Sequence, residues 1–541
     1  GTGFCTGVGM AVAARQLAAR MENEDLFDQR IFVLSSDGGM MEGCTHEAAS
    51  LAGHQKLGNL IAFYDDNQIT IEGSTDLAFS EDVGARFAAY GWQVLRVDGH
   101  DGDEISAALE DAVAETDRPS LIIGRTTIGY GSPNMAGGHE THGAPLGEDE
   151  VKAVKKNLGF PEDQTFFVPE DVRAFCAERI AELRASADEW NERLAAFRKE
   201  NPDKAELLDS LVEQTVPETI LADLLEAVPE KETATRSSGG EILQRAAALV
   251  PAITGGAADL NPSTKTYLKA ESDFTPENRA GRNIHFGVRE FAMGLCANGL
   301  SLYGTALPFT ATFTVFSDFM KPALRLAAIQ ELHNVYVFTH DSIFVGEDGP
   351  THQPIEQLLM TRSIPGMTVI RPAESHEVAH AWAAALRNNG PTALFLTRQS
   401  VANFTAEMAE RIDVSRGAYV LSDEEDFELI LIGTGSETAL ALETAELIRK
   451  QGIAVRVVSM PSWELFEKQD RAYRDSVLPP PCTKRVSIEA GTTVGWDRYV
   501  GAEGLAIGID HFGHSAPYTF LAEKYGLQAE AVAERIGLHF G

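Results

Sequence analysis

Cysteine is scarce in this sequence and follows no metal-binding or disulfide pattern. The 541 residues include five cysteines, at the scattered positions Cys5, Cys44, Cys176, Cys296 and Cys482. A small, odd number of scattered cysteines is typical of reduced thiols in a cytoplasm and lacks the spacing of a zinc site. Apolar runs of membrane-spanning length are also missing, and no signal-peptide pattern opens the sequence. We therefore expect a soluble, cytoplasmic protein.

Basic residues are few compared with acidic ones. Lys and Arg together number 45 against 80 Asp and Glu, which gives a net charge of −35. Such a surface repels phosphate backbones and anionic lipids, so nucleic acid and membranes are not expected as partners. The hydrophobic content of 44% and the charged content of 23% are those of a globular protein, and the length predicts several domains.

Two apolar runs near the start of the chain each lead into polar residues. The run Ile31–Leu34 precedes Asp37 and Gly38, and the run Leu60–Tyr64 precedes Asn67. Apolar runs of this length, separated by a helix-compatible segment, predict two parallel strands. Because open α/β sheets bind ligands at the carboxyl ends of their strands, we expect Asp37 and Asn67 to meet at one sheet edge.

The oxygen atoms of this stretch suit a divalent cation. Asp37 offers a carboxylate, Asn67 an amide oxygen and Ile69 a backbone carbonyl, which is the ligand type that Mg²⁺ prefers while it also binds phosphates. Gly38 would let the backbone approach those phosphates closely. An Asp-Gly pair alone is usually an ordinary turn, but a second motif after the next strand favours a metal–diphosphate site.

The spacing of these motifs is similar to the thiamine-diphosphate signature, and the surrounding residues resemble the transketolase family. The matching strings are Asp37-Gly38-x-Met40-Met41-Glu42-Gly43 and Tyr64-Asp65-Asp66-Asn67, with Ser36 where the family usually has Gly. The resemblance extends in order over essentially the whole chain. It implies thiamine diphosphate as cofactor, together with Mg²⁺ or Ca²⁺.

Strand and helix patterns alternate through most of the chain, which predicts three doubly wound α/β domains. By the resemblance, residues 1–195 form a diphosphate- and metal-binding domain, 233–411 a pyrimidine-binding domain and 412–541 a C-terminal domain. Residues 196–232 are polar and helix-prone and are expected to be a linker. The first domain lacks the family's N-terminal portion, which indicates a truncated or split form.

Glu290 lies where an expected strand, Asn283–His285, gives way to an apolar helix, Phe291–Leu302. The ordinary role of a glutamate there is to stabilise the helix dipole. The resemblance of the whole motif Phe286–Phe291 instead implies the catalytic acid that protonates the cofactor's aminopyrimidine ring. Burial would raise the pKa of this carboxyl group.

Phe313, Phe316 and Phe319 recur at helical spacing, and we expect them on one helix. Such a stripe is most often plain core. The resemblance implies that the three rings enclose the aminopyrimidine, with Phe319 where the family commonly has Tyr. It also implies that Ile71 supports the thiazolium ring.

The most specific string of the chain follows an expected strand at Val335–His340. It runs from Thr339 to Pro354 and has little structural reason to carry so many His and Asp residues. By the resemblance, His340 reaches the substrate phosphate, whereas Asp348 and His352 bind the sugar's carbonyl and hydroxyl groups. His352 is also a candidate catalytic residue.

Three further residues are candidates for binding the substrate phosphate: Arg236, Ser263 and Arg398. Arginine forks suit phosphate oxygens, although a single Arg is more often part of a surface ion pair. Asp259 matches an acid near the cofactor and is equally plausible as a turn residue. His142 matches a histidine that closes over the diphosphate and the substrate and is a candidate catalytic residue.

The third domain contains the Gly-rich turn Gly433-Thr434-Gly435-Ser436-Glu437 after an expected strand. No Lys follows it, so a phosphate-binding loop is not indicated. A strand-to-helix turn capped by Ser436 explains it better. We expect no chemistry in this domain.

The resemblance implies ketol transfer in the pentose phosphate pathway. A two-carbon unit would pass from xylulose 5-phosphate to ribose 5-phosphate or erythrose 4-phosphate through the cofactor's carbanion, with ping-pong kinetics. Asp37 and Glu290 lie far apart along the chain. The resemblance implies that the first domain of one subunit pairs with the second domain of its partner, so a homodimer with interfacial active sites is expected. The alternatives are a related thiamine-diphosphate synthase, and an inactive scaffold or subunit that needs a companion N-terminal polypeptide.

Overall fold

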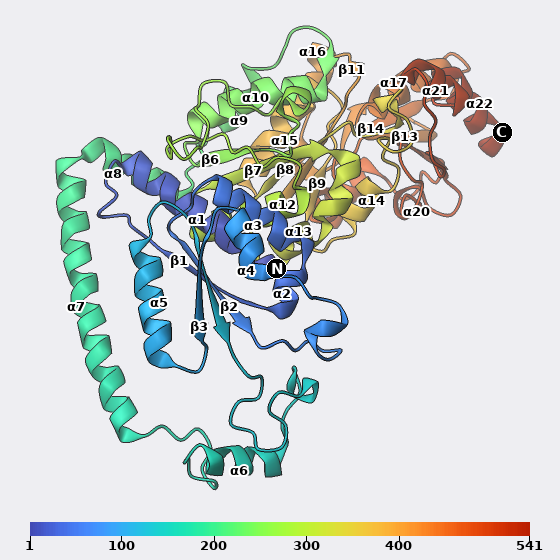
Figure 1. The fold of residues 1–541 in the computed structure, drawn as a ribbon. Coiled ribbons are helices and arrows are strands. Elements are labelled where there is room, and N and C mark those ends of the chain that lie inside the picture. Colours follow the sequence, from blue (N-terminus) through green and yellow to red (C-terminus); the bar gives the residue numbers. More distant parts are fainter. The chain divides into compact units, whose positions relative to one another are not determined.

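The computed structural model describes residues 1–541, which form two compact units (Figure 1). The first unit consists of Gly1–Asp209 and the short segment Thr275–Ala280, and the second consists of Ser210–Phe274 and Gly281–Gly541. Neither unit has a helix whose length and hydrophobicity would let it cross a membrane.

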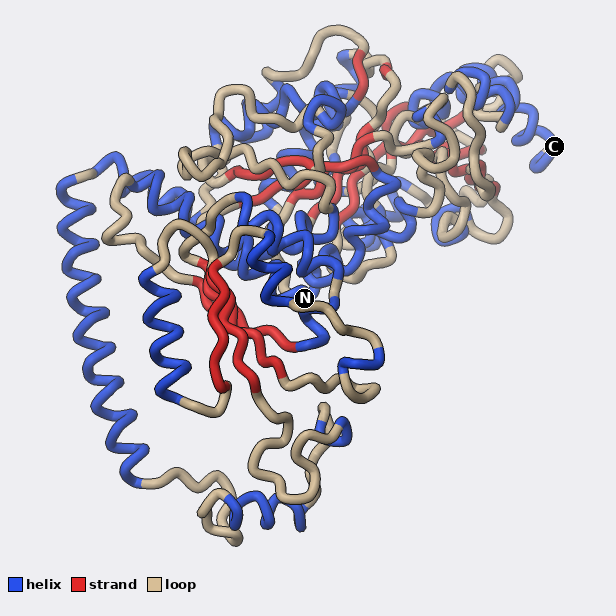
Figure 2. Tube along the Cα trace, viewed as in Figure 1, coloured by secondary structure: helices blue, strands red, loops and turns tan.

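The first unit is built on a four-stranded parallel sheet in the order β1-β2-β4-β3 (Figure 2). Its strands are β1 (Ile31–Ser36), β2 (Leu60–Asp66), β3 (Gln93–Asp98) and β4 (Ser120–Arg125). The register pairs Ser36 with Asp65, so β1 and β2 end side by side. The loops after both strands therefore begin at the same sheet edge.

Helices cover this sheet through small and aliphatic side chains. Residues Ala108 and Ala112 of α5 pack on the sheet beside Ile61 and Ile122, and Asp101 caps that helix by accepting hydrogen bonds from two backbone N–H groups. The helices are α1 (Thr2–Met21), α2 (Asp37–Met41), α3 (Gly43–His54), α4 (Val83–Ala89), α5 (Gly102–Ala114), α6 (Glu148–Asn157), α7 (Glu170–Glu200) and α8 (Pro202–Glu213). The domain boundary expected at residue 195 lies inside α7.

The second unit contains two sheets, of which the first is wholly parallel and has the order β6-β7-β8-β10-β9. Its strands are β6 (Ile253–Ala257), β7 (Leu307–Phe313), β8 (Val335–Thr339), β9 (Thr368–Ile370) and β10 (Thr392–Leu396). Nearly every strand residue is buried, because helices lie on both faces. These include α10 (Thr235–Leu249), α12 (Glu290–Tyr303), α13 (Ser317–Ile329) and α15 (Ser375–Arg387).

The second sheet of this unit has the order β12-β14-β13-β15-β16, with β12 antiparallel to its neighbour. Its strands are β12 (Tyr419–Ser422), β13 (Leu429–Gly433), β14 (Val455–Ser459), β15 (Arg485–Ile488) and β16 (Leu505–Ile507), covered by α17 (Glu437–Arg449) and α22 (Ala529–Phe540) among others. The predicted doubly wound α/β class is thus confirmed. The strand expected at Asn283–His285 is wrong, because only an isolated pairing of Asn283 with Gly255 and Asp273 forms there.

A buried ion pair joins the two sheets of the second unit. Arg362, the last residue of α14 (Gln357–Arg362), lies 2.9 Å from Glu489 beyond β15, and the two side chains are 3% and 4% exposed. The Arg362 guanidinium also lies 4.0 Å from the ring centroid of Trp463. Hydrogen bonding and the aromatic face offset the cost of removing both charges from water.

Candidate active site

Asp37 is a buried carboxylate that ties the ends of β1 and β2 together. It begins α2, and only 2% of its surface is exposed. One carboxylate oxygen accepts a hydrogen bond from the Tyr64 hydroxyl at 2.7 Å, and the other accepts from the backbone N–H groups of Asn67 and Gln68 at 3.2 and 3.1 Å. The predicted meeting of Asp37 and Asn67 at one sheet edge is confirmed.

Burial controls the ionisation of this pair. It raises the pKa of Asp37, while the hydrogen bond from Tyr64 acts in the opposite direction. Burial also raises the pKa of Tyr64, so the phenol keeps its proton and acts as the donor. Asn67 folds back so that its amide oxygen accepts from the backbone N–H of Ile69 at 3.0 Å.

The residues of this edge fit a divalent cation held together with a diphosphate. Asp37, Asn67 and Ile69 offer carboxylate, amide and carbonyl oxygens, all of them hard ligands, and the backbone N–H of Asn67 lies 3.2 Å from the Asp37 carboxylate. A Cβ added at Gly38, the second residue of α2, would meet nothing within 4 Å, so the start of this helix faces open space. No group of three or more His, Cys, Asp or Glu side chains could hold a metal, and a cation here would depend on amide, backbone and ligand oxygens.

The other candidates of the first unit lie on loops. Ile71 follows β2 and is 75% exposed. His142 is exposed and ends a 3₁₀ turn, His139–Thr141, in the loop that follows β4. Both loops leave the sheet at its carboxyl edge, as does the loop that carries Asp37.

In the second unit, four strands end in candidate residues. β6 leads to Asp259, β7 ends with Phe313, β8 leads to His340 and β10 leads to Arg398. The carboxyl edge of a parallel sheet is where such folds bind ligands. The sheet therefore gathers residues that are as far apart in the sequence as Asp259 and Arg398.

Arg236, His340 and Arg398 form a cationic cluster, called here the phosphate cluster. The Arg236 guanidinium donates to the Ser263 carbonyl at 2.8 Å and lies 3.3 Å from the His340 ring nitrogen Nε2. Neither Arg236 nor Arg398 pairs with a carboxylate in the structure. In a chain with 80 acidic residues, two neighbouring arginines without a counter-ion indicate an anion site.

His340 is neutral in this cluster. Burial lowers the pKa of His340 to about 3, and the positive charges of Arg236 and Arg398 act in the same direction. Burial and Arg398 likewise lower the pKa of Arg236. The ring of His340 lies against Phe313, with 3.7 Å between centroids.

The three phenylalanines do not share a helix, so that prediction is wrong. Phe313 ends β7, Phe316 belongs to a 3₁₀ turn (Thr314–Phe316) and Phe319 lies in α13. Their rings nevertheless form a ladder with centroid distances of 6.0 and 6.2 Å and interplanar angles of 11° and 21°. Phe319 is 59% exposed, so the ladder is open at one end. His352 meets it edge-on at 5.6 Å from Phe316.

The remaining candidates of the second unit lie at a helix start or on loops. Glu290 is half-buried and is the first residue of α12, as expected, but the raised pKa expected for it stays a prediction. Asp259 is exposed and has a left-handed backbone with φ of 61°. Asp348 is exposed on the loop that carries His352.

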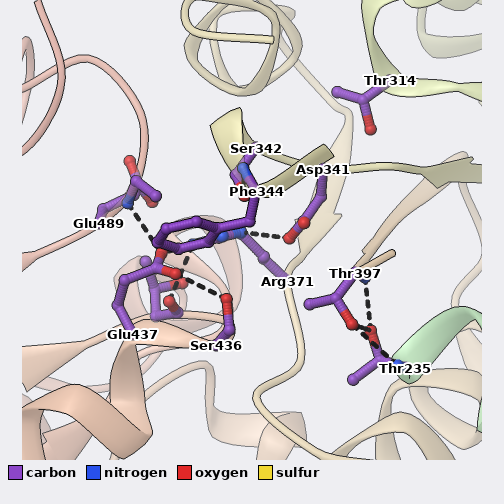
Figure 3. Close-up of polar contacts among 12 residues, drawn as sticks. Thr235, Thr314, Asp341, Ser342, Phe344, Arg371, Thr397, Ser436, Glu437 and Glu489 are labelled. Carbon is purple, nitrogen blue, oxygen red and sulfur yellow. Dashed lines mark hydrogen bonds and ion pairs between the residues drawn. The ribbon is translucent and has the colours of Figure 1, made fainter. Parts of the chain in front are cut away.

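Sequence reasoning missed a buried ionic group beside this site (Figure 3). Asp341 directly follows His340 and pairs with Arg371 at 2.8 Å, and Arg371 also pairs with Glu437. An acid directly after a candidate site residue was the available signal. Its partner Arg371 could not be found from sequence spacing.

Three family models match the chain in order. They are the transketolase thiamine diphosphate binding domain over residues 1–217, the transketolase pyrimidine binding domain over 231–403 and the transketolase-like C-terminal domain over 417–528.

Individual relatives match along nearly the whole chain. A transketolase from Geobacillus stearothermophilus is 48% identical over 99% of this chain and 81% of its own length. The structure of a transketolase from Leishmania mexicana has a TM-score of 0.95 at 37% identity, over 99% of this chain and 79% of that one. A Pichia stipitis transketolase solved with sedoheptulose 7-phosphate has a TM-score of 0.94 at 38% identity, over 100% of this chain and 80% of that one.

Proposed function

The chain belongs to the transketolase family, and we propose that it transfers a two-carbon ketol unit between sugar phosphates. The donor would be xylulose 5-phosphate, and the acceptor ribose 5-phosphate or erythrose 4-phosphate, as in the pentose phosphate pathway. The observation that carries this choice is the phosphate cluster, where Arg236 and Arg398 flank the neutral His340 without a carboxylate partner. A sugar phosphate supplies the missing negative charge.

Thiamine diphosphate supplies, when bound, the carbon nucleophile and electron sink that this transfer needs. Asp37, Asn67 and the Ile69 carbonyl would hold its Mg²⁺, and the open space at Gly38 would receive the diphosphate. Glu290 and the phenylalanine ladder would hold the pyrimidine.

The chain's own residues would then bind and orient the sugar. The Arg236 and Arg398 forks would hold the phosphate, with Ser263 at the same edge. The neutral His340 accepts from Arg236 through Nε2, so its one N–H, on Nδ1, donates to the Thr339 hydroxyl and orients the ring. Asp348 and His352 lie on the loop that would face the sugar hydroxyls. His352 and His142 are the groups proposed to move protons, and Asp259 would lie near the cofactor.

The metal half and the pyrimidine half of this site belong to different compact units of the chain. We propose that a homodimer completes two sites, each with the first unit of one copy and the second unit of the other. A sedimentation measurement that finds a monomer with bound cofactor would contradict this arrangement.

The test is an assay with xylulose 5-phosphate and ribose 5-phosphate in the presence of thiamine diphosphate and Mg²⁺. Turnover with parallel initial-rate lines is expected. Asp37→Asn should abolish Mg²⁺-dependent cofactor binding, whereas Asp98→Asn, at the end of β3 on the same edge, should not. Binding that is equal in both variants would refute the assigned metal site.

Two alternatives give different results in this assay. A related synthase would turn over pyruvate-like donors, which have no phosphate for Arg236 and Arg398. A scaffold or incomplete subunit would bind no thiamine diphosphate, or would bind it only when a companion polypeptide is added. The assay is therefore run with both donor classes, and with and without such a polypeptide.

A further inference from the structure

The turn Thr434–Glu437 connects β13 to α17, and its Ser436 and Glu437 lie beside Arg371 (Figure 3). It belongs to the third domain, in which no chemistry was expected. Its contacts go to the residue after His340 and to the residue after Arg398.

The first connection runs to Asp341 through Arg371. Arg371 Nε donates to the Asp341 carboxylate at 2.8 Å. Arg371 Nη1 donates to the Thr434 carbonyl at 2.9 Å and to the Glu437 carboxylate. The side chains of all three charged residues are at most 1% exposed. Hydrogen bonds between ionised groups that are excluded from water are strong, so the three side chains have little freedom to move.

The second connection runs to Gln399 through Ser436. The Ser436 hydroxyl donates its proton to the Glu437 carboxylate at 2.6 Å, so its oxygen can only accept from Gln399 Nε2 at 3.1 Å. Because the Gln399 amide must present its NH₂ group to Ser436, the orientation of that amide is determined. Glu437 therefore receives both connections, one on each carboxylate oxygen.

A pair of threonines, Thr235 and Thr397, links the two chain segments that carry the cluster arginines. The backbone N–H of Thr235 donates to the Thr397 hydroxyl at 2.9 Å, and the backbone N–H of Thr397 donates to the Thr235 hydroxyl at 2.6 Å. Each threonine immediately precedes a cluster arginine, Arg236 or Arg398. Hydrogen bonds therefore fix the position of the residue before each of the two arginines.

His340 needs such support because its backbone is strained. Its φ is 60°, a left-handed conformation that costs a non-glycine residue free energy and persists only when the surroundings impose it. Thr314 donates to the Thr339 carbonyl at 3.0 Å on one side, and Arg371 holds Asp341 on the other. Phe344, three residues beyond Asp341, is buried in the core of the third domain.

We propose that Arg371, Ser436 and Glu437 are positioning residues, through which the third domain sets the geometry of the substrate-phosphate site. The inference rests on the proposed function, because it concerns the same site. A cluster of two arginines and a neutral histidine binds phosphate well only when its donors converge, and the third domain supplies the rigidity that convergence requires.

The test is Ser436→Ala, which removes the hydroxyl that accepts from Gln399 Nε2 and donates to Glu437 Oε1, while Arg371 stays paired with Glu437 Oε2. The KM for xylulose 5-phosphate should rise about tenfold, the loss expected from ~1.4 kcal/mol of binding free energy. The kcat, and the KM for unphosphorylated D-xylulose, should stay unchanged. Ser436→Thr keeps the hydroxyl and should restore the wild-type KM.

The matched control is Ser462→Ala, which removes a buried serine that caps α18 (Trp463–Glu467) in the same domain. It should lower stability without changing either KM. If Ser436→Ala raises both KM values together, lowers kcat, or changes nothing, the positioning role is refuted.

Calorimetric binding of ribose 5-phosphate separates this inference from the proposed function. Wild-type binding that Ser436→Ala weakens about tenfold supports the positioning role even if no turnover is seen. Equal binding by wild type and variant overturns the positioning role alone. Absence of wild-type binding overturns both.

Discussion

Replacing Arg371 with methionine would remove the one positive charge between two buried carboxylates. Asp341 and Glu437 both pair with Arg371, and none of the three side chains is more than 1% exposed. Although burial opposes it, the two carboxylates raise the pKa of Arg371, so the guanidinium is charged in the folded protein. Methionine fills a similar volume but cannot neutralise either carboxylate.

We expect Arg371→Met to lower the free energy of unfolding of the second unit by about 3–5 kcal/mol, the usual cost of breaking a buried pair from one side. For a unit of this size that corresponds to a fall in Tm of about 4–7 °C. The control is Arg471→Met, whose side chain is 85% exposed and pairs with Asp475 one helical turn away. Such a surface pair contributes at most about 1 kcal/mol.

The loss should depend on pH. Burial raises the pKa of Glu437, and Arg371 opposes that shift, so the variant should hold its Glu437 proton to higher pH than the wild type. Because the folded pKa then lies above the unfolded one, stability is lost as pH rises through that range. Arg371→Met should be more impaired at pH 8 than at pH 5, and adding Glu437→Gln should recover part of the loss.

Urea unfolding followed by tryptophan fluorescence measures these differences, since Trp463 and Trp496 are buried in this unit. A loss below about 1 kcal/mol would refute the buried-charge argument, as would a loss that is the same at both pH values.

Three further results are expected. Tyr64→Phe removes the hydroxyl that donates to Asp37, and it should weaken Mg²⁺-dependent cofactor binding about tenfold by titration; unchanged affinity would contradict the metal assignment. His340→Asn should reduce the loss of stability that the protein shows at acidic pH, because the folded pKa of His340, about 3, lies below the ordinary 6.5 and stability is lost as pH falls between these values. The difference should be roughly 2–3 kcal/mol at pH 4.5. Denaturant titrations in which the variant loses as much stability as the wild type would contradict this prediction. Ile71→Ala should change the free energy of unfolding by less than about 0.5 kcal/mol, because the side chain is 75% exposed. It should nevertheless reduce turnover. Full activity of the variant would refute the role of Ile71 against the thiazolium ring.

The strands and their carboxyl edges could be predicted because their signals are local. Runs such as Ile31–Leu34 and Leu429–Gly433 are apolar, β-branched and bounded by turn residues, and both lie in strands. Once two parallel strands are placed, the meeting of Asp37 and Asn67 follows from topology alone.

The errors have identifiable physical causes. Phe313, Phe316 and Phe319 have the spacing of a helix, but a strand end followed by a 3₁₀ turn brings rings together at the same intervals. Arg371 could not be linked to Glu437 because they are 66 positions apart, and Arg371 follows β9 of one sheet whereas Glu437 begins the helix after β13 of the other. Pairings of that kind depend on how two folded layers dock.

The ion pair of Arg362 and Glu489 has a consequence for how the second unit unfolds. It spans the two sheets with both side chains almost completely buried, and Trp496 donates a further hydrogen bond to Glu489 at 3.0 Å. Pulling the sheets apart would break these bonds together before either charge gained full hydration. Local unfolding of one sheet alone therefore requires a large free energy. The two sheets should unfold in a single cooperative transition although each has its own core.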